Sequence, residues 1–318
     1  MRAKLIAAFA IVYVVWGSTY FAIRVGLEGL PPFTLGAVRF LAAGGALFLV
    51  ARLRGLPAPT RAQWGVAAIT GTLMLLLGNG AVIFAEQRAP SGLVALVVTS
   101  VPLWMVLLDW LRPGGTRPDA AVIGGLALGS LGIVLLVDPA AALRGAGVPP
   151  FEALILLIGT LGWAAGSVYS RHNRVAGSAT SFAALQMLIA GAMFSIVATV
   201  RGEVTQLDLG AVPGRSWLAV AYLAVFGSVI SYSAYLWLTK AATPARLGTY
   251  AYVNPIVALV LGAAFAGEVV TPRVVLAAAL VLSAVVLITA GRDRVNAAIR
   301  VFPFRGRRTG GAPKREAA

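Results

Sequence analysis

Apolar residues in this 318-residue chain fall into ten long runs, separated by short segments that hold most of the proline and charge. A helix needs about 20 apolar residues to cross the hydrocarbon core of a bilayer. The pattern therefore predicts ten membrane-spanning helices, at residues 5–25, 33–50, 65–84, 92–111, 119–137, 151–171, 179–200, 217–238, 246–265 and 274–290. Fifteen of the 17 prolines lie outside these runs, and because proline interrupts helices, they mark the same boundaries independently.

Composition agrees with a membrane protein. Hydrophobic residues make up 59% of the chain and charged residues 12%, about half the share usual in soluble domains. So few charges cannot coat a soluble globule of this size. The lack of cysteine excludes a disulfide scaffold, and the high hydrophobicity excludes a disordered chain.

The formal net charge of +15 would suggest a nucleic-acid partner if the basic residues shared one face. They sort by membrane side instead. With a cytoplasmic N-terminus, 19 of the 26 Lys and Arg residues flank cytoplasmic span ends, six flank the opposite ends, and Arg39 lies within the second span. The positive-inside rule then places both termini in the cytoplasm, and no nucleic-acid partner is expected. Only three lysines against 23 arginines favour a bacterial source, so the expected location is the bacterial inner membrane.

The two halves of the chain resemble each other at two constant offsets. An offset of 147 residues pairs Trp16 with Trp163 and Arg24 with Arg171, and an offset of 153 pairs Trp64 with Trp217 and Pro102 with Pro255. Each half holds five spans, so the second half enters the membrane from the opposite face, as in many secondary transporters. We predict a first repeat at 1–146, a second at 147–291 and a basic cytoplasmic tail at 292–318.

Three motifs carry a resemblance to a known family. They are Trp16-Gly17-Ser18-Thr19-Tyr20, Pro31-Pro32-Phe33 leading to Arg39-Phe40, and Tyr250-Ala251-Tyr252-Val253-Asn254-Pro255 leading to Gly267-Glu268. Over residues 5–291 the chain resembles the EamA family of the drug/metabolite transporter (DMT) superfamily, and most of all its YedA-like members. The resemblance implies an all-α polytopic membrane protein, with ten transmembrane helices in two inverted five-helix EamA repeats around a central cavity. It also implies efflux of small organic metabolites by alternating access, without catalytic chemistry.

Polar and aromatic side chains recur at helical spacing on several spans, so each set shares one helix face. The predicted substrate pathway consists of Trp16, Tyr20, Arg39, Asn79, Trp163, Gln186, Tyr232, Tyr235, Tyr250 and Asn254. The alternative is that these residues serve helix packing and interfacial aromatic belts, as side chains at span ends commonly do. The fifth and tenth spans lack such residues, so we expect them at the periphery and the other eight around the cavity.

Three in-span residues have two interpretations each. Arg39 either binds an anionic group of the solute or has a structural role, in which it reaches outward or pairs with Glu86. Its repeat counterpart, Gln186, is uncharged, which breaks the symmetry. Pro102 and Pro255 each remove one helical hydrogen bond, so they are predicted helix kinks that either flex or shape the bundle statically.

Motifs and residue types that the sequence lacks limit the possible functions. There is no glycine-rich phosphate loop, and His172 is the single histidine, so neither ATP use, a metal site nor another cofactor is expected. No carboxylate lies at mid-membrane, which favours a neutral, zwitterionic or anionic solute. The coupling ion stays open, with a proton as one candidate, and the chain is a monomer or homodimer among membrane lipids.

The sequence therefore predicts a secondary transporter that exports small amphipathic organic metabolites, such as amino acids or aromatic compounds. Three alternatives stay open: a sugar-phosphate or nucleotide-sugar importer, an uncoupled facilitator, and a membrane scaffold that transports nothing. The importer should hold more buried basic residues than the single Arg39. The scaffold should tolerate apolar residues throughout its polar stripes. An enzyme is not expected, because no acidic or histidine cluster exists at a membrane face.

Overall fold

The computed structural model describes residues 2–113, 117–118, 120–136, 147–173, 175, 177–241 and 250–301. Within these ranges the chain is helical and contains no strand. The first half consists of α1 (Arg2–Ala10), η1 (Ile11–Val15), α2 (Trp16–Gly26), α3 (Pro32–Leu53), α4 (Arg61–Thr70), η2 (Gly71–Asn79), α5 (Gly80–Ala85), α6 (Ser91–Val98), α7 (Val101–Leu111) and α8 (Ala120–Leu136). The second consists of α10 (Pro150–His172), α11 (Ala179–Val200), α12 (Glu203–Gln206), α13 (Gly214–Tyr222), η3 (Leu223–Ile230), α14 (Ser231–Ala241), α16 (Tyr250–Phe265) and α17 (Pro272–Val301).

These elements form the ten predicted spans. Seven continuous helices are long and apolar enough to cross a membrane, and three shorter apolar helices at Ala120–Leu136, Val253–Phe265 and Pro272–Leu287 complete the set. Large apolar side chains such as Leu49, Ile196 and Val260 are exposed on the outside of the bundle, where lipid would cover them. The last helix continues to Val301, beyond the predicted span end at residue 290, and the rest of the predicted tail lies outside the described residues.

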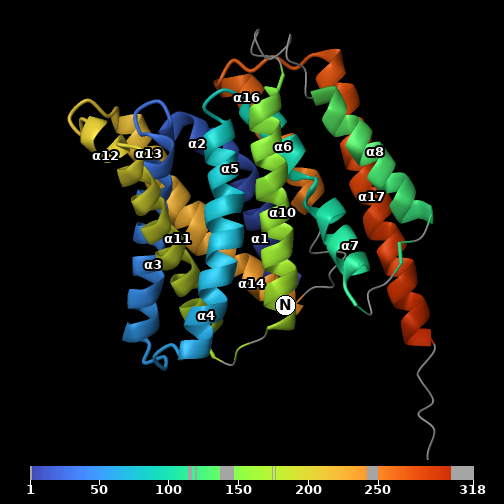
Figure 1. The fold of residues 1–318 in the computed structure, drawn as a ribbon, viewed down its shortest axis with the longest axis horizontal. Helices are drawn as coiled ribbons and strands as arrows, with labels where there is room; N and C mark the ends of the chain where they lie inside the picture. The colour runs from blue at the N-terminus through green and yellow to red at the C-terminus, as the bar shows by residue number, and fades with distance from the viewer. Residues whose placement is uncertain are drawn as a thin grey trace, which may run out of the picture.

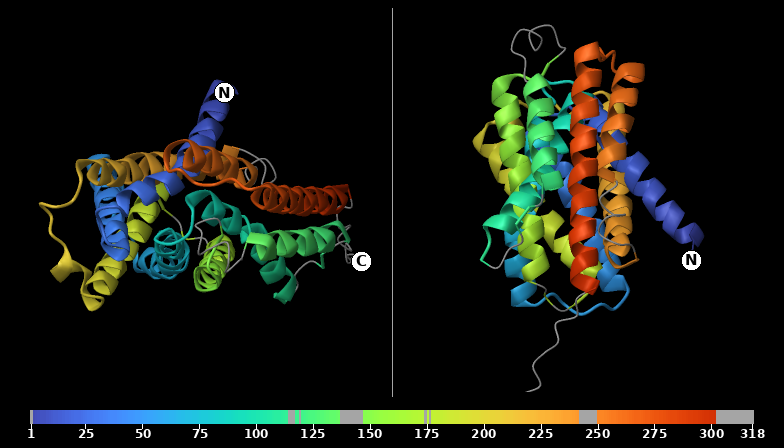
Figure 2. Two further views of the ribbon diagram at one scale, coloured as in Figure 1. Left: turned by 90° about the horizontal axis from the view of Figure 1, so that it is seen from above. Right: turned by 90° about the vertical axis from the view of Figure 1, so that its right-hand side faces the viewer.

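Repeat counterparts pack against each other. The second span, α3, lies along the seventh, α11, at one side of the bundle, and the fifth, α8, lies along the tenth, α17, at the other (Figure 1). The left view of Figure 2 shows α8 and α17 at the right-hand edge of the bundle, and in the right view they face the viewer. We call the end where α2 finishes and α3 begins the Arg24 end, and the end where α1 begins the N-terminal end.

Two π-helical segments occupy equivalent places in the two repeats. The segment η2 covers Gly71–Asn79 and η3 covers Leu223–Ile230, so an offset of 153 residues superimposes them almost completely. The third segment, η1, has no such counterpart, because α10 stays α-helical through the matching residues. A π-helical turn accommodates an extra residue and rotates the side chains beyond it, and such turns are frequent at functional sites. Hydropathy does not report this rotation, so the pattern of apolar residues did not predict the π-helical segments.

The two in-span prolines have different local structures. In the fourth span the helix ends at Val98 and restarts at Val101, so Pro102 stands in the first turn of α7, where its missing N–H breaks no helical bond. The hydroxyl of Thr99 donates to the carbonyl of Leu96 at 2.5 Å within this break. In the ninth span, Pro255 lies inside α16. One span is therefore divided where its counterpart continues.

Paired glycines allow α3 and α11 to approach closely. A Cβ on Gly44 would lie 2.8 Å from the backbone nitrogen of Leu188, and one on Gly191 would lie 2.8 Å from that of Leu41. Both pairs are related by the 147-residue offset. By contrast, a Cβ on Gly45 would meet no atom within 4 Å. Small residues at helix crossings are the usual way for membrane helices to pack tightly.

This contrast predicts opposite effects for two neighbouring substitutions. Gly44→Ala pushes α3 away from α11. Overpacking of this kind lowers the free energy of unfolding by about 1–3 kcal/mol. Gly45→Ala adds only helix propensity, which stabilises a helix by roughly 0.5–1 kcal/mol. Thermal unfolding in detergent should show a lower midpoint for G44A and an equal or higher one for G45A. Equal midpoints for the two variants would contradict the close crossing.

Candidate functional site

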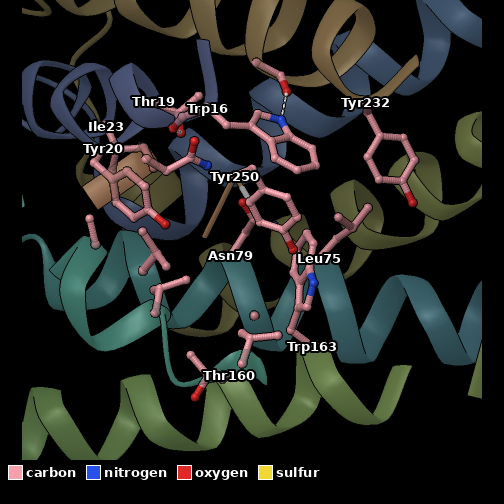
Figure 3. Close-up of a pocket in the computed structure, with 18 of the residues that line it drawn as sticks. Trp16, Thr19, Tyr20, Ile23, Leu75, Asn79, Thr160, Trp163, Tyr232 and Tyr250 are labelled. Atoms are coloured by element: carbon pink, nitrogen blue, oxygen red, sulfur yellow. Dashed lines mark hydrogen bonds between the residues drawn. The ribbon is translucent and has the colours of Figure 1, made fainter. Parts of the chain in front are cut away.

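A central cavity of about 130 Å³ lies between the two repeats. Its walls come from eight of the ten spans, and no described residue of α8 or α17 contributes, in agreement with the expectation from sequence. Figure 3 shows Trp16, Tyr250 and Trp163 near the middle of this cavity, with Tyr20 and Tyr232 on either side. The lining is mainly apolar and aromatic, with few polar groups, as is usual for small-molecule sites.

Equivalent residues of the two repeats line the same cavity. Seven lining pairs are related by the offset of 147 or 153: Trp16 and Trp163, Phe40 and Met187, Leu75 and Ser228, Asn79 and Tyr232, Val98 and Ala251, Val101 and Asn254, and Pro102 and Pro255. The apolar members of these pairs carry no signal in the sequence beyond hydrophobicity, so they could not be predicted as lining residues. The cavity therefore lies on the pseudo-two-fold axis of the inverted repeat.

Eight of the ten predicted pathway residues line the cavity, and Gln186 and Tyr235 do not. The amide of Gln186 donates to the Thr70 hydroxyl at 2.8 Å and accepts from the Tyr232 hydroxyl at 2.9 Å. These bonds hold it inside the protein, with 1% of its surface exposed. Tyr235 lies behind the wall, its ring centre 5.1 Å from that of Trp16 and 6.1 Å from that of Tyr250.

The aromatic wall is fixed by contacts between spans. The indole N–H of Trp16 donates to the carbonyl of Gly227 in η3 at 3.1 Å, and its ring meets Tyr250 edge-on at 5.5 Å (Figure 3). On the opposite side, Trp163 packs over Gly78 of η2, where a Cβ would lie 3.0 Å from the indole ring. Both tryptophans therefore lie beside a π-helical segment of the other repeat.

Arg39 is a buried cation with spare hydrogen-bonding capacity. Its side chain lines the cavity with 4% of the residue exposed, its Nε donates to the Ser228 hydroxyl at 3.0 Å, and its guanidinium lies 4.8 Å from the Phe40 ring centre. Its Nη1 has no hydrogen-bond partner. The Glu86 carboxylate is equally unpartnered, so the pair considered from sequence is not formed. A guanidinium held in this way can bind a carboxylate or another anionic group by donating hydrogen bonds to it.

The two asparagines that line the cavity differ in whether their side-chain amides already have hydrogen-bond partners in the protein. Asn254 is buried, and its amide nitrogen, in the orientation that satisfies both of its polar groups, donates to the carbonyls of Tyr13 at 3.1 Å and Tyr250 at 3.2 Å. Asn79 is partly exposed at the end of η2 and faces the cavity (Figure 3). Asn254 thus supports the backbone around Pro255, whereas the side chain of Asn79 faces the space a solute would occupy.

Contacts between distant segments close the Arg24 end. The Glu268 carboxylate accepts from the backbone N–H of Ser91 at 2.6 Å and of Gly92 at 3.0 Å, which caps the start of α6. In the second repeat, the Glu203 carboxylate caps α3 by accepting from the backbone N–H of Thr34 at 2.8 Å. Carboxylates at helix N-termini interact favourably with the helix dipole.

Within the described residues no group of three or more potential metal ligands occurs.

Known proteins match this chain over most of its length. A model of the EamA-like transporter family matches residues 3–138 and 150–290. The inner membrane transporter YedA of Escherichia coli K12 is 42% identical, over 90% of each chain. A protein of the same organism named "Probable amino-acid metabolite efflux pump" is 26% identical over 86% of this chain and 90% of its own.

The protein PecM of Dickeya dadantii is 28% identical over 86% of this chain and 88% of its own. A solved crystal structure of a protein shares the fold with a TM-score of 0.63, at 22% identity over 91% of this chain and 98% of that one. The family match spans both repeats, and the relatives match nearly the full length of the bundle. The chain therefore belongs to the EamA-like transporter family.

Proposed function

We propose that this protein is a secondary transporter that exports small amphipathic metabolites, such as amino acids or aromatic compounds, across the bacterial inner membrane. The observation that carries the proposal is the cavity on the repeat axis, where tryptophan and tyrosine rings surround a guanidinium with an unpartnered N–H. Relatives named as a transporter and an efflux pump support the class of activity and its direction. The pathway consists of the eight lining residues predicted from sequence, with Gln186 and Tyr235 supporting them from behind.

The size of the cavity favours a small solute. A cavity needs about 10–15 Å³ to hold one water, so this cavity of about 130 Å³ holds on the order of ten waters. A solute of about ten non-hydrogen atoms fills that space, which corresponds to an amino acid or a single-ring aromatic compound. A nucleotide sugar is several times larger.

The polarity of the cavity favours a solute that carries a carboxylate. Among the described residues, Arg39 is the one charged residue of the lining, and no aspartate or glutamate lines the cavity. The free Nη1 of Arg39 would bind the carboxylate, Asn79 would bind a further polar group, and Trp16 and Trp163 would enclose the apolar part. Aromatic rings suit this role because they supply large rigid contact surfaces.

Alternating access follows from the repeat symmetry. We propose that the repeats, bounded at 1–146 and 147–291, move against each other so that the cavity opens to each side in turn. The equivalent segments η2 and η3 and the break at Thr99–Ser100 lie in the walls that must move. By the positive-inside rule, the Arg24 end faces the periplasm and both termini face the cytoplasm.

A metabolite screen with purified protein in liposomes tests the proposal, with thermal shift and counterflow as readouts. At least one amino-acid-sized carboxylate should both raise the unfolding midpoint and exchange across the membrane. Arg39→Ala should weaken that solute roughly 10–100-fold, the loss of a charged hydrogen bond of about 1.5–3 kcal/mol. Arg215→Ala, which removes an exposed arginine paired with Glu28, is the matched control. A screen without any binding solute, or equal flux in both variants, would contradict the assignment.

The aromatic wall generates a second prediction. Trp163→Ala should reduce solute affinity about 2–10-fold, because an aromatic contact contributes about 0.5–1.5 kcal/mol beyond its buried area. Trp163→Phe should retain most of the affinity. Trp217 is partly exposed and lies away from the cavity, so Trp217→Ala should leave solute affinity unchanged. The same counterflow assay measures all three, and a large effect of W217A would indicate that tryptophan loss acts through folding.

The orientation has its own test, because the natural chain has no cysteine. Ala58 and Ala211 are exposed loop residues at opposite ends of the bundle. In intact cells, a membrane-impermeant maleimide should label Ala211→Cys and spare Ala58→Cys, and disruption of the membrane should make both reactive. Labelling of A58C alone in intact cells would reverse the proposed topology.

A further inference from the structure

The carboxyl group of Glu86 is buried without a hydrogen-bond partner at the Arg24 end. The residue follows the last residue of α5, none of its surface is exposed, and neither of its carboxyl oxygens has a partner. Other carboxylates at this end are satisfied: the buried Glu152 pairs with Arg88 at 3.3 Å, and the partly exposed Glu268 caps α6. Glu86 therefore differs from its neighbours.

The cations near Glu86 are directed elsewhere. Arg24 of α2 donates from Nη1 to the backbone carbonyl of Glu86 at 2.7 Å, and Arg39 of α3 donates from Nε to Ser228. The other ionisable groups that face Glu86 are Tyr20 of α2 and Glu268 of the segment after α16. Glu268 is itself an acid, so it opposes a second negative charge at Glu86.

An ionised carboxylate in this position would be costly. Buried charges without a partner cost several kcal/mol and are usually avoided by a change of protonation state. Burial raises the pKa of Glu86 well above its usual range, and Glu268 adds to the rise, while Arg24 and Arg39 oppose it. A neutral carboxyl thus explains how Glu86 stays buried. It also leaves Nη1 of Arg39 free, whereas an ionised Glu86 would compete for that cation.

The position of Glu86 connects it to closure of the cavity. Val82 lines the cavity, and Glu86 lies one helical turn farther toward the Arg24 end on the same face of the span. Tyr20 lines the cavity beside it. Any opening of the cavity at the Arg24 end would bring water to this carboxyl, and hydration favours its ionised form.

We propose that Glu86 is a proton-binding site, and that the Arg24 end closes over the cavity only when this carboxyl holds a proton. On closure, the carboxylate takes one proton from water at the open end and forms a neutral carboxylic acid. On opening, the acid returns that proton to water, and no other bond changes. The inference rests on the proposed alternating access, and it names the proton as the ion on which transport depends.

The sign of the pH dependence follows from linkage. The pKa of Glu86 is raised in the closed state, so closure is fully favoured below the ordinary value of 4.5 and is lost as the pH rises through the raised value. Between these two values the ratio of open to closed molecules grows by up to about tenfold for each pH unit. The open state should therefore accumulate at alkaline external pH.

Cysteine labelling tests the inference without any solute. Val82→Cys places one thiol in the cavity, a turn from Glu86, and right-side-out membrane vesicles expose the Arg24 end to a membrane-impermeant maleimide. The labelling rate is compared with that of the same thiol in the double variant with Glu86→Gln, because the ratio cancels the intrinsic pH dependence of thiol reactivity. That ratio should rise with the pH above 4.5, by up to about tenfold for each pH unit until the raised pKa is passed.

Two controls separate charge from structure. Glu152→Gln removes another buried carboxyl at the same end, and it should leave the rise intact because Glu152 is paired with Arg88. Glu86→Asp keeps a titratable group and should retain a pH-dependent rate. Should E86Q fail to reach the membrane, Glu86→Met supplies the uncharged reference.

A labelling ratio that stays constant with pH would overturn the proton site. The proton site would also be overturned if E152Q abolished the pH-dependent rise as completely as E86Q does. Failure of the proposed function is a separate outcome. Labelling needs no solute, so a pH-dependent ratio stands even if no metabolite is transported. Conversely, if a solute binds as proposed but the labelling ratio does not change with pH, only the proton site is contradicted and the proposed function stands.

Discussion

A lipid bilayer offers no hydrogen-bond partner to a backbone amide or carbonyl, and the architecture of this protein depends on that constraint. Each described span satisfies it with helical bonds, and the departures from regular α-helix fall beside the cavity. The helix break at Thr99–Ser100, the proline at 255 and the segments η2 and η3 all contribute lining residues or adjoin them. Irregular backbone thus gathers beside the cavity, although the outer faces of the π-helical segments still carry exposed apolar side chains such as Leu77 and Phe226.

The closed end of the cavity depends on helix capping more than on surface charge. Exposed ion pairs such as Arg215 with Glu28 contribute little in water, because solvent screens them and two long side chains must be ordered. The caps formed by Glu268 and Glu203 instead satisfy backbone amides that the helices leave unpaired. Separation of the repeats at this end must break these caps, so they oppose opening directly.

Sequence reasoning recovered the features that the membrane imposes. The number of spans follows from helix length, and the inverted repeat follows from paired residues such as Trp16 and Trp163. What it missed depends on contacts between spans. Gln186 turns from the cavity because Thr70 and Tyr232 bond its amide, and Glu86 is unpartnered because nearby arginines have other partners. Neither choice of partner leaves a trace in hydropathy, and the π-helical segments shift side chains without changing composition.

The seven matched pairs of lining residues bear on how such a cavity can diversify. In an assembly of two identical five-span chains, every substitution would alter the solute site twice, on opposite walls. With both halves joined in one chain, a single wall can change alone. The cation at Arg39 faces the cavity while its counterpart Gln186 serves the scaffold, and this difference gives a nearly symmetric chamber one chemically distinct side. Under the proposed function, a solute with unlike ends would bind in one orientation.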